Sequence, residues 1–393
     1  MMKSCVEPFD FETISFDDAL VIEATITNEL KRHEISLTRT FPFEEDAPSG
    51  ESNANVVVTD DLLNTYSFEE TTPGKYVSIT EFSAEPNRIY ELSITTRDGS
   101  TYSSQPTELP QVTQIDDLMA IREVNTDGMD GVTIYANSFD PTGNSRNYRY
   151  EFEETYLIIA PFAISPEEVV VLSDLPPYSI DTSVTTQPRS GEERSCFNTV
   201  FSNTIVQTQT TGLQEDRVSR FPIHFVQSND PIIRNRYSIN VIQYVQSLEA
   251  FTYYSVLNEF SDSERLLSQN QSGFINGNII SNENPDEKVI GFFEITSVSS
   301  KRLFFNFFDI FPDINRPFYF TECVLDSPRL VSEADPTISP LIDLIQSNSL
   351  RHVETNTDFF GNINPVTPYR MVNTPCGDCT VFGTNIKPDF WID

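Results

Sequence analysis

Apolar and polar residues alternate along most of the first hundred residues. Leu20, Ile22, Ala24 and Ile26 are separated by mostly polar positions, the period of a strand that buries one face. The same period recurs at residues 35–39, 54–58, 66–68, 75–80, 88–97 and 100–104. About seven short strands in one hundred residues predict an immunoglobulin-like or fibronectin-like β-sandwich over residues 19–110.

Turn residues separate these strands at the expected places. Pro73-Gly74 and Asp98-Gly99 are dipeptides typical of tight turns between paired strands. Tyr90 follows the loop residues 85–87, the position at which a tyrosine corner ties a loop to a strand through its hydroxyl. The alternative for Tyr90 is that its ring simply fills the core.

A second region begins near residue 111, after Pro110 breaks the pattern. Its predicted strands are residues 132–137, 147–159, 199–210, 217–227, 236–246 and a pair, 289–298 and 301–308, joined by a turn at Ser299-Ser300. Residues 161–195 are expected to be an extended surface excursion. The chain is therefore predicted to be mainly β, with a larger antiparallel β domain over residues 111–393.

One or two short helices interrupt this second region. Ser247 is a plausible N-cap, and Leu248, Phe251, Tyr254 and Leu257 recur every three residues behind it, as on the buried face of a helix. A weaker helical pattern covers residues 340–347.

Aromatic residues form a stripe on the strand at 147–159. Tyr148, Tyr150 and Tyr156 share one face with Phe152. Tyrosine has a flat apolar ring with a polar tip, so this stripe could line a groove for a sugar or a peptide. The same spacing is also that of ordinary core, which we favour.

The charge of the chain excludes one class of partner. The 393 residues hold 59 acids and 25 bases, a formal net charge of −34. Such a surface repels phosphate backbones, so no nucleic acid is expected as a partner. No apolar run approaches the 18 or so residues of a membrane-spanning helix.

Cys5 and the acidic stretch behind it are typical of a bacterial lipoprotein. Residues 1–18 have no strict period and are predicted to be a tether. Acyl chains on Cys5 would then anchor the chain in a membrane. Only four residues precede Cys5, fewer than a signal peptide needs, so either the true start lies upstream or Cys5 is a free thiol.

The other four cysteines are Cys196, Cys323, Cys376 and Cys379. Four cysteines allow three pairings, and two disulfides are the usual arrangement in an exported protein. The Cys-Gly-Asp-Cys spacing also fits zinc or redox sites, which stay as alternatives. We expect Cys376 and Cys379 to bond to Cys196 and Cys323, which would tie the C-terminus to the domain body. No metal or cofactor is expected.

Groups for catalysis are few. His33, His224 and His352 are isolated in the sequence, and no His-Glu-x-x-His, Gly-x-Ser-x-Gly or phosphate-binding glycine motif occurs. Glu153-Glu154 is the best pair of acids for glycoside hydrolysis, but we favour an edge or solvated pair. We therefore predict no catalytic residues and keep a hydrolase as the last alternative.

Several segments in order carry a resemblance to a known family: Cys5-Val-Glu-Pro, Leu20-Val-Ile-Glu-Ala-Thr-Ile-Thr, Pro86-Asn-Arg-Ile-Tyr-Glu-Leu-Ser-Ile, Gly277-Asn-Ile, Val289-Ile-Gly-Phe-Phe-Glu and Cys376-Gly-Asp-Cys379. The chain resembles the Bacteroidota lipoproteins grouped as domain of unknown function 4249. The resemblance implies a lipoprotein anchored in the outer membrane, facing the cell exterior. It implies no enzyme activity and no catalytic residues.

The resemblance also implies a partner. Such proteins look like companions of outer-membrane β-barrels, either TonB-dependent transporters or the barrel-assembly machine. A free-standing surface module that binds a glycan or a peptide is the alternative. Neither the ligand nor the companion subunit follows from the sequence.

Overall fold

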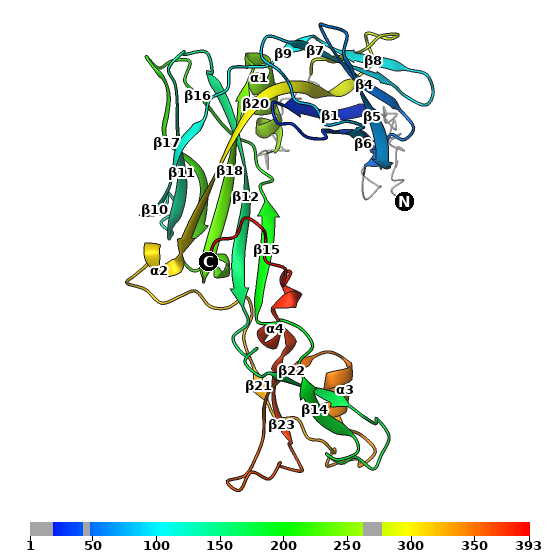
Figure 1. The fold of residues 1–393 in the computed structure, drawn as a ribbon, viewed down its shortest axis with the longest axis vertical. Helices are drawn as coiled ribbons and strands as arrows, with labels where there is room; N and C mark the ends of the chain where they lie inside the picture. The colour runs from blue at the N-terminus through cyan, green and yellow to red at the C-terminus, as the bar shows by residue number, and fades with distance from the viewer. Residues whose placement is uncertain (1–18, 42–47, 262–276) are drawn as a thin grey trace, which may run out of the picture.

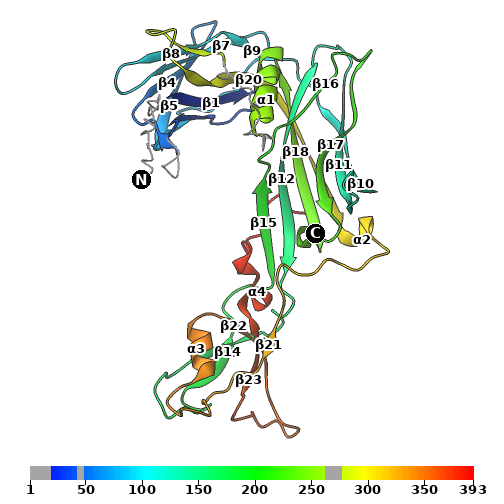
Figure 2. The same ribbon diagram turned by 180° about the vertical axis from the view of Figure 1, so that it is seen from behind.

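The computed structural model describes residues 19–41, 48–261 and 277–393, so Cys5 lies outside the described residues. The chain is mainly β, as predicted, and the molecule is elongated (Figure 1). An N-terminal body lies at one end, a middle body of long strands follows, and a distal lobe forms the other end. Figure 2 shows the same order from behind.

Among the described residues before 110, the N-terminal body has nine strands: β1 (Leu20–Thr27), β2 (Glu34–Arg39), β3 (Ser49–Gly50), β4 (Asn55–Asp60), β5 (Thr65–Thr72), β6 (Lys75–Ser78), β7 (Ile89–Thr95), β8 (Thr101–Ser104) and β9 (Thr107–Glu108). The main strands bury every second residue in one common core. Since the strands that cover this core belong to one hydrogen-bonded path, the sheet folds over itself. Figures 1 and 2 show β7 and β8 lying over β1. The likeness to an immunoglobulin domain stays a prediction.

The local turn predictions in this body are confirmed. Gly74 and Gly99 have φ angles of 80° and 94°, which favour glycine at these turns. The Tyr90 hydroxyl accepts a hydrogen bond of 2.9 Å from the backbone N–H of Glu85. Tyr90 therefore ties a loop to β7, and its ring is also buried in the core.

The prediction of two paired strands around Ser299-Ser300 is wrong. Residues Val289–Asn306 form one strand of 18 residues, β20. Its first half runs parallel to β1, and its second half runs antiparallel to β18 (Arg236–Gln246). Two serines without glycine, proline or asparagine do not specify a turn, and strand partners are available on both stretches.

Because of β20, the N-terminal body does not end at residue 110. β19 (Ile279–Ser281) pairs with β8, and Ile279, Val289, Phe293 and Ile295 are buried in the N-terminal core. The division into 19–110 and 111–393 is therefore corrected: the chain leaves this body near residue 110, and β19 and the first half of β20 belong to it again.

The middle body consists of two sheets that pack face to face around a second core. One sheet holds β10 (Ile115–Val124), β11 (Asp130–Asp140) and β17 (Asp216–Gln227). The other holds β12 (Asn147–Ile159), β15 (Ser195–Phe201), β16 (Val206–Gln209), β18 and the second half of β20. Because β20 belongs to both bodies, one hydrogen-bonded sheet runs through them.

Helix α1 (Leu248–Ser261) begins where the sequence predicts it. The Ser247 hydroxyl accepts a hydrogen bond of 3.1 Å from the N–H of Ala250. The buried face is partly as predicted. Tyr254 and Leu257 pack against the cluster that Ala250 and Tyr253 form with Phe292 of β20, whereas Leu248 is 61% exposed. Two single turns, η1 (Pro231–Ile233) and α2 (Phe307–Ile310), lie at the far end of the middle body.

The distal lobe is built from two separated segments of the chain. Its elements are β13 (Glu167–Val171), β14 (Val184–Pro188), β21 (Leu325–Asp326), α3 (Pro340–Gln346), β22 (Leu350–Thr355), β23 (Tyr369–Asn373), α4 (Thr374–Gly377) and η2 (Cys379–Val381). The helix predicted at 340–347 is confirmed. The surface excursion predicted at 161–195 is instead a β-hairpin, because Val169 and Val184 pack on α3 and β23 in a small core of their own.

Candidate functional site

The aromatic stripe of β12 belongs to the core. Tyr148 and Tyr150 are fully buried, and Tyr156 is 6% exposed. Their hydroxyls are satisfied inside the middle body: that of Tyr148 donates to Asp216 at 2.8 Å, and that of Tyr150 donates to Gln243 at 3.0 Å. The alternative of an open groove for a sugar or a peptide is therefore not found at this stripe.

The three histidines lie in three different bodies. His33 is buried in the N-terminal body, with Nε2 2.9 Å from the Phe82 carbonyl oxygen. His224 of β17 lies 3.4 Å from Glu154, in the middle body. His352 of β22 lies in the distal lobe, with Nδ1 3.0 Å from the Ser165 hydroxyl. The structure does not bring them together into one site.

Glu153 and Glu154 point away from each other, because neighbouring residues of a strand face opposite sides of the sheet. Glu153 pairs with Arg302 at 3.3 Å. Glu154 is buried and accepts a hydrogen bond of 2.7 Å from Tyr237. Burial raises the pKa of Glu154, but hydrogen bonds from His224 and Tyr237 outweigh this effect and lower it. The two carboxylates do not flank a common space. Glu154 was expected to be solvated, but it is buried.

Both cysteines of the Cys-Gly-Asp-Cys motif bond to distant partners, as expected. Cys196 is bonded to Cys379, and Cys323 is bonded to Cys376. The motif is thus a double attachment point, not a dithiol. No three His, Cys, Asp or Glu side chains gather to hold a metal ion in the part of the chain that the structure describes.

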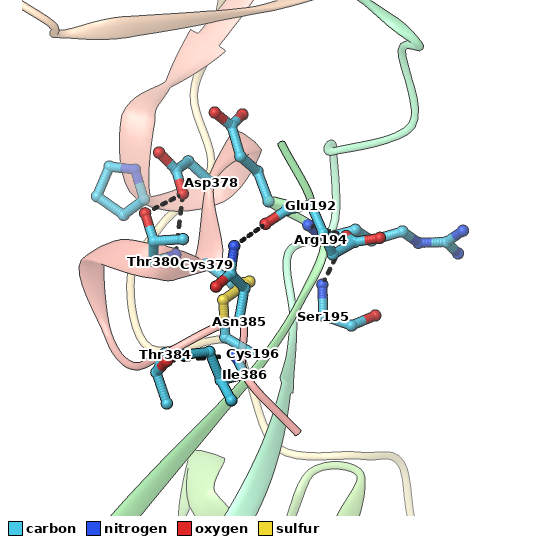
Figure 3. The surroundings of a disulfide bond; sticks show 12 residues. Glu192, Arg194, Ser195, Cys196, Asp378, Cys379, Thr380, Thr384, Asn385 and Ile386 are labelled. Carbon is cyan, nitrogen blue, oxygen red and sulfur yellow. Dashed lines mark hydrogen bonds between the residues drawn. A yellow bond between two sulfur atoms is a disulfide. The ribbon is translucent and has the colours of Figure 1, made fainter. Parts of the chain in front are cut away.

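Backbone hydrogen bonds reinforce the Cys196–Cys379 bond, whose surroundings Figure 3 shows. The N–H of Cys379 donates to the Glu193 carbonyl at 2.8 Å, and Phe197 and Thr384 exchange two hydrogen bonds of 2.7 and 2.9 Å. The Asn385 amide donates to the Glu192 carbonyl at 2.9 Å. The segment after the motif is therefore attached along the first residues of β15.

Ion pairs fix the same junction between the middle body and the distal lobe. Arg351 of β22 lies 2.8 Å from Asp378, and Arg189, after β14, pairs with Glu193. Burial raises the pKa of Asp378, but hydrogen bonds from Thr380 and Arg351 outweigh it, so the pKa is lowered and the carboxylate stays ionised. The sequence pointed to the cysteines here but gave no signal for the two arginines.

A second set of buried charges lies where the N-terminal and middle bodies meet. Arg149 of β12 stacks on the rings of Tyr244 and Tyr254 and lies 3.3 Å from Glu294 of β20. Glu294 is 1% exposed and also accepts a hydrogen bond of 2.7 Å from the Gln246 amide. The junctions of the middle body with the N-terminal body and with the distal lobe thus both contain charged groups whose positions are fixed by their neighbours.

Comparisons with known proteins give a family and no activity. No helix in the described residues is long and apolar enough to cross a membrane. A comparison with curated proteins finds no match to the chain. One family model matches residues 6–302, which include the N-terminal body and most of the middle body. The chain therefore belongs to the family described as domain of unknown function 4249.

Proposed function

We propose that the protein is a lipoprotein of the outer membrane, anchored through acyl chains on Cys5 and displayed on the cell exterior. It acts there, without an enzyme activity of its own, as an accessory subunit of a β-barrel in transport or in barrel assembly. The anchor restricts the protein to the membrane plane, which raises its effective concentration at such a partner. Glu7, Asp10 and Glu12 after Cys5 suit an acidic signal for surface display.

One observation carries this proposal: the N-terminal body and the distal lobe lie at opposite ends of an elongated molecule. A chain that starts at Cys5 enters the N-terminal body at β1, whereas the distal lobe lies at the opposite end of the long axis (Figure 1). The shared strand β20 joins the N-terminal body to the middle body, and the Cys196–Cys379 bond joins the middle body to the distal lobe. An elongated molecule that is anchored through its N-terminal body holds the distal lobe at a fixed distance from the anchor.

The two disulfides support export. Disulfides form and persist in oxidising compartments and are rare in the reducing cytosol. Cys196–Cys379 closes a sequence separation of 183 residues, and Cys323–Cys376 closes one of 53. Bonds that close such long segments are expected to add about 2–5 kcal/mol each to the free energy of unfolding.

The test is made on the protein taken from its own membrane. Mass spectrometry of the mature N-terminus is expected to show acyl chains on Cys5, and a Cys5→Ser variant should leave the membrane fraction. Purification of the wild type in a mild detergent should also recover one β-barrel protein in a fixed ratio. An unacylated N-terminus, or the absence of any barrel, would count against the proposal.

A further inference from the structure

The loop between β22 and β23 is nearly free of charge in a strongly acidic chain. This tip loop, residues 356–368, lies at the end of the molecule opposite the N-terminal body (Figures 1 and 2). It contains one charged residue, Asp358, and no Lys or Arg, although the chain has a net charge of −34. Its surface is therefore chemically distinct from its surroundings.

Two adjacent aromatic rings project from this loop into solvent. Phe359 is 96% exposed and Phe360 is 84% exposed. Their ring centroids are 5.6 Å apart at an interplanar angle of 86°, so the rings contact each other edge to face. Ile363 and Val366 are also exposed on the loop. Contiguous exposed apolar side chains of this kind mark interaction surfaces.

Hydrogen bonds hold the turn that presents the two rings. The Asp358 carboxylate accepts from the N–H of Phe360 at 2.8 Å and from the N–H of Asn362 at 2.9 Å. The Asn362 side-chain amide donates to the same carboxylate at 3.0 Å. Gly361 has a φ of 85°, which glycine adopts without strain and which closes the turn.

The base of the loop is fixed as well. The N–H of Asn356 donates to the Pro368 carbonyl at 2.8 Å, and the Asn356 side chain donates to the Thr367 carbonyl at 2.9 Å. β23 then leads within a few residues to Cys376, which is bonded to Cys323. A loop ordered before binding loses little conformational entropy in a complex, so the rings are suited to contribute affinity.

We propose that Phe359 and Phe360 form an aromatic anchor that inserts into an apolar pocket of a protein partner. Aromatic side chains that fill a pocket dominate the affinity of protein interfaces. A lipid surface is disfavoured as the occupant, because the loop has no Lys or Arg to bind anionic headgroups and the acidic chain is repelled by anionic lipids. By the same argument, the rim of the pocket is neutral or basic.

This inference rests on the proposed function for one point: the anchor requires a protein partner, and the proposed function identifies that partner as a β-barrel. The first experiment places a photo-crosslinking phenylalanine analogue at Phe359 or at Phe360 in the full-length protein in its own membrane. Leu63, 87% exposed in a turn of the N-terminal body, is the matched control position. Irradiation is expected to link both tip positions to the same protein and to give no such adduct at Leu63.

The second experiment compares two double variants in purification with a mild detergent. Phe359→Ser/Phe360→Ser is expected to lower the yield of the co-purified protein about tenfold or more, as the loss of a central anchor does. Leu62→Ser/Leu63→Ser, at two other exposed apolar side chains, should leave the yield unchanged. Both variants should keep the unfolding midpoint of the wild type, because none of these side chains is buried.

The outcomes separate the two proposals. Adducts with a protein that is not a barrel support the anchor and contradict the proposed function. Adducts with lipid alone, or no adduct, overturn the anchor. A barrel recovered equally with the wild type and with Phe359→Ser/Phe360→Ser overturns the anchor and leaves the proposed function standing.

Discussion

At the scale of single residues, His33 makes the N-terminal body sensitive to acid. Its ring is 2% exposed, and Nε2 lies 2.9 Å from the Phe82 carbonyl. Burial disfavours the charged imidazolium and lowers the pKa of His33 from 6.5 to about 4, although the hydrogen bond to Phe82 acts in the opposite direction. The unfolded chain therefore binds a proton between pH 6.5 and 4 that the folded chain does not bind.

We predict that the His33 imidazole lowers the free energy of unfolding as the pH falls from 6.5 to 4. Between pH 7 and pH 4.5, the free energy of unfolding should lose about 2 kcal/mol through His33 alone, at 1.36 kcal/mol per pKa unit. His33→Gln can keep a donor to Phe82 but does not titrate. Between pH 7 and pH 4.5, the free energy of unfolding of this variant should therefore fall by about 2 kcal/mol less than that of the wild type. Urea denaturation of both proteins at the two pH values measures the difference. Parallel losses in the two proteins would contradict the prediction.

Residue roles could be predicted from sequence where the partner is near in the chain. Tyr90 and Ser247 contact residues only five and three positions away, so their neighbours in the sequence were sufficient evidence. The sequence indicated that Cys376 and Cys379 bond to Cys196 and Cys323, but not which cysteine bonds to which, because two of the three pairings satisfy that expectation. Arg149 gave no signal, because its partner Glu294 is 145 residues away and an isolated charge in a strand usually faces solvent.

At the scale of elements, the Arg149–Glu294 pair links β12 to β20. We predict that Arg149→Met lowers the free energy of unfolding by about 3–5 kcal/mol, because it leaves the Glu294 carboxylate buried without its cation. Adding Glu294→Gln removes that charge and keeps a group that can accept from Gln246, so the double variant should recover more than half of the loss. Thermal and urea unfolding measure the three proteins.

An exposed ion pair provides the control for this experiment. Arg370 and Glu354 lie 3.0 Å apart, with side chains 49% and 58% exposed. Arg370→Met should change the free energy of unfolding by less than about 1 kcal/mol, because water screens such a pair. An equal effect of Arg149→Met and Arg370→Met would show that the buried pair does not hold the two strands together.

The Gly-Asn-Ile and Val-Ile-Gly-Phe-Phe-Glu segments of the sequence are explained by a single contact between chain segments. A Cβ built on Gly277 would lie 1.5 Å from the Gly291 carbonyl oxygen, and one on Gly291 would lie 2.1 Å from the Ile22 carbonyl oxygen. Between them, the Asn278 side chain accepts from the Phe293 N–H at 2.7 Å and donates to the Phe293 carbonyl at 2.8 Å. These residues allow β20 to approach β1.

We predict that Gly291→Ala destabilises the N-terminal body by several kcal/mol, since its φ of 146° and the backbone of Ile22 leave no place for a methyl group. The expected signature is faster hydrogen exchange in β1 and β19. Gly191→Ala is the control, because a Cβ there meets nothing within 4 Å. Unchanged exchange in Gly291→Ala would refute this role for the glycine.

At the scale of the whole molecule, the chain crosses between bodies more often than its sequence pattern indicates. The alternation of apolar residues predicts strands but not their partners, and β8 and β19 are joined across about 175 residues of chain. β20 lies in the region 111–393 that was expected to be antiparallel, yet its first half runs parallel to β1. The fold class was therefore predictable, whereas the division into bodies was not, because it depends on pairings between distant segments.

This architecture makes residues 19–110 an incomplete unit. Without residues 277–298, the core lacks Ile279, Val289, Phe293 and Ile295, and β1 has an unpaired edge. Large apolar side chains missing from a core cost about 2–5 kcal/mol each, and an entire small domain is stabilised by only about 5–15 kcal/mol. The isolated segment 19–110 is therefore expected to lack a cooperative unfolding transition.

A second fragment makes this expectation falsifiable. Residues 19–110 joined by a flexible glycine–serine linker to residues 277–298 restore β19 and the half of β20 that pairs with β1, so this fragment should unfold cooperatively in urea and show dispersed amide resonances. Gly291→Ala in the joined fragment should abolish both properties, since it prevents the approach of β20 to β1. If 19–110 alone unfolds with the same midpoint as the joined fragment, β20 does not complete the N-terminal body but only lies against it.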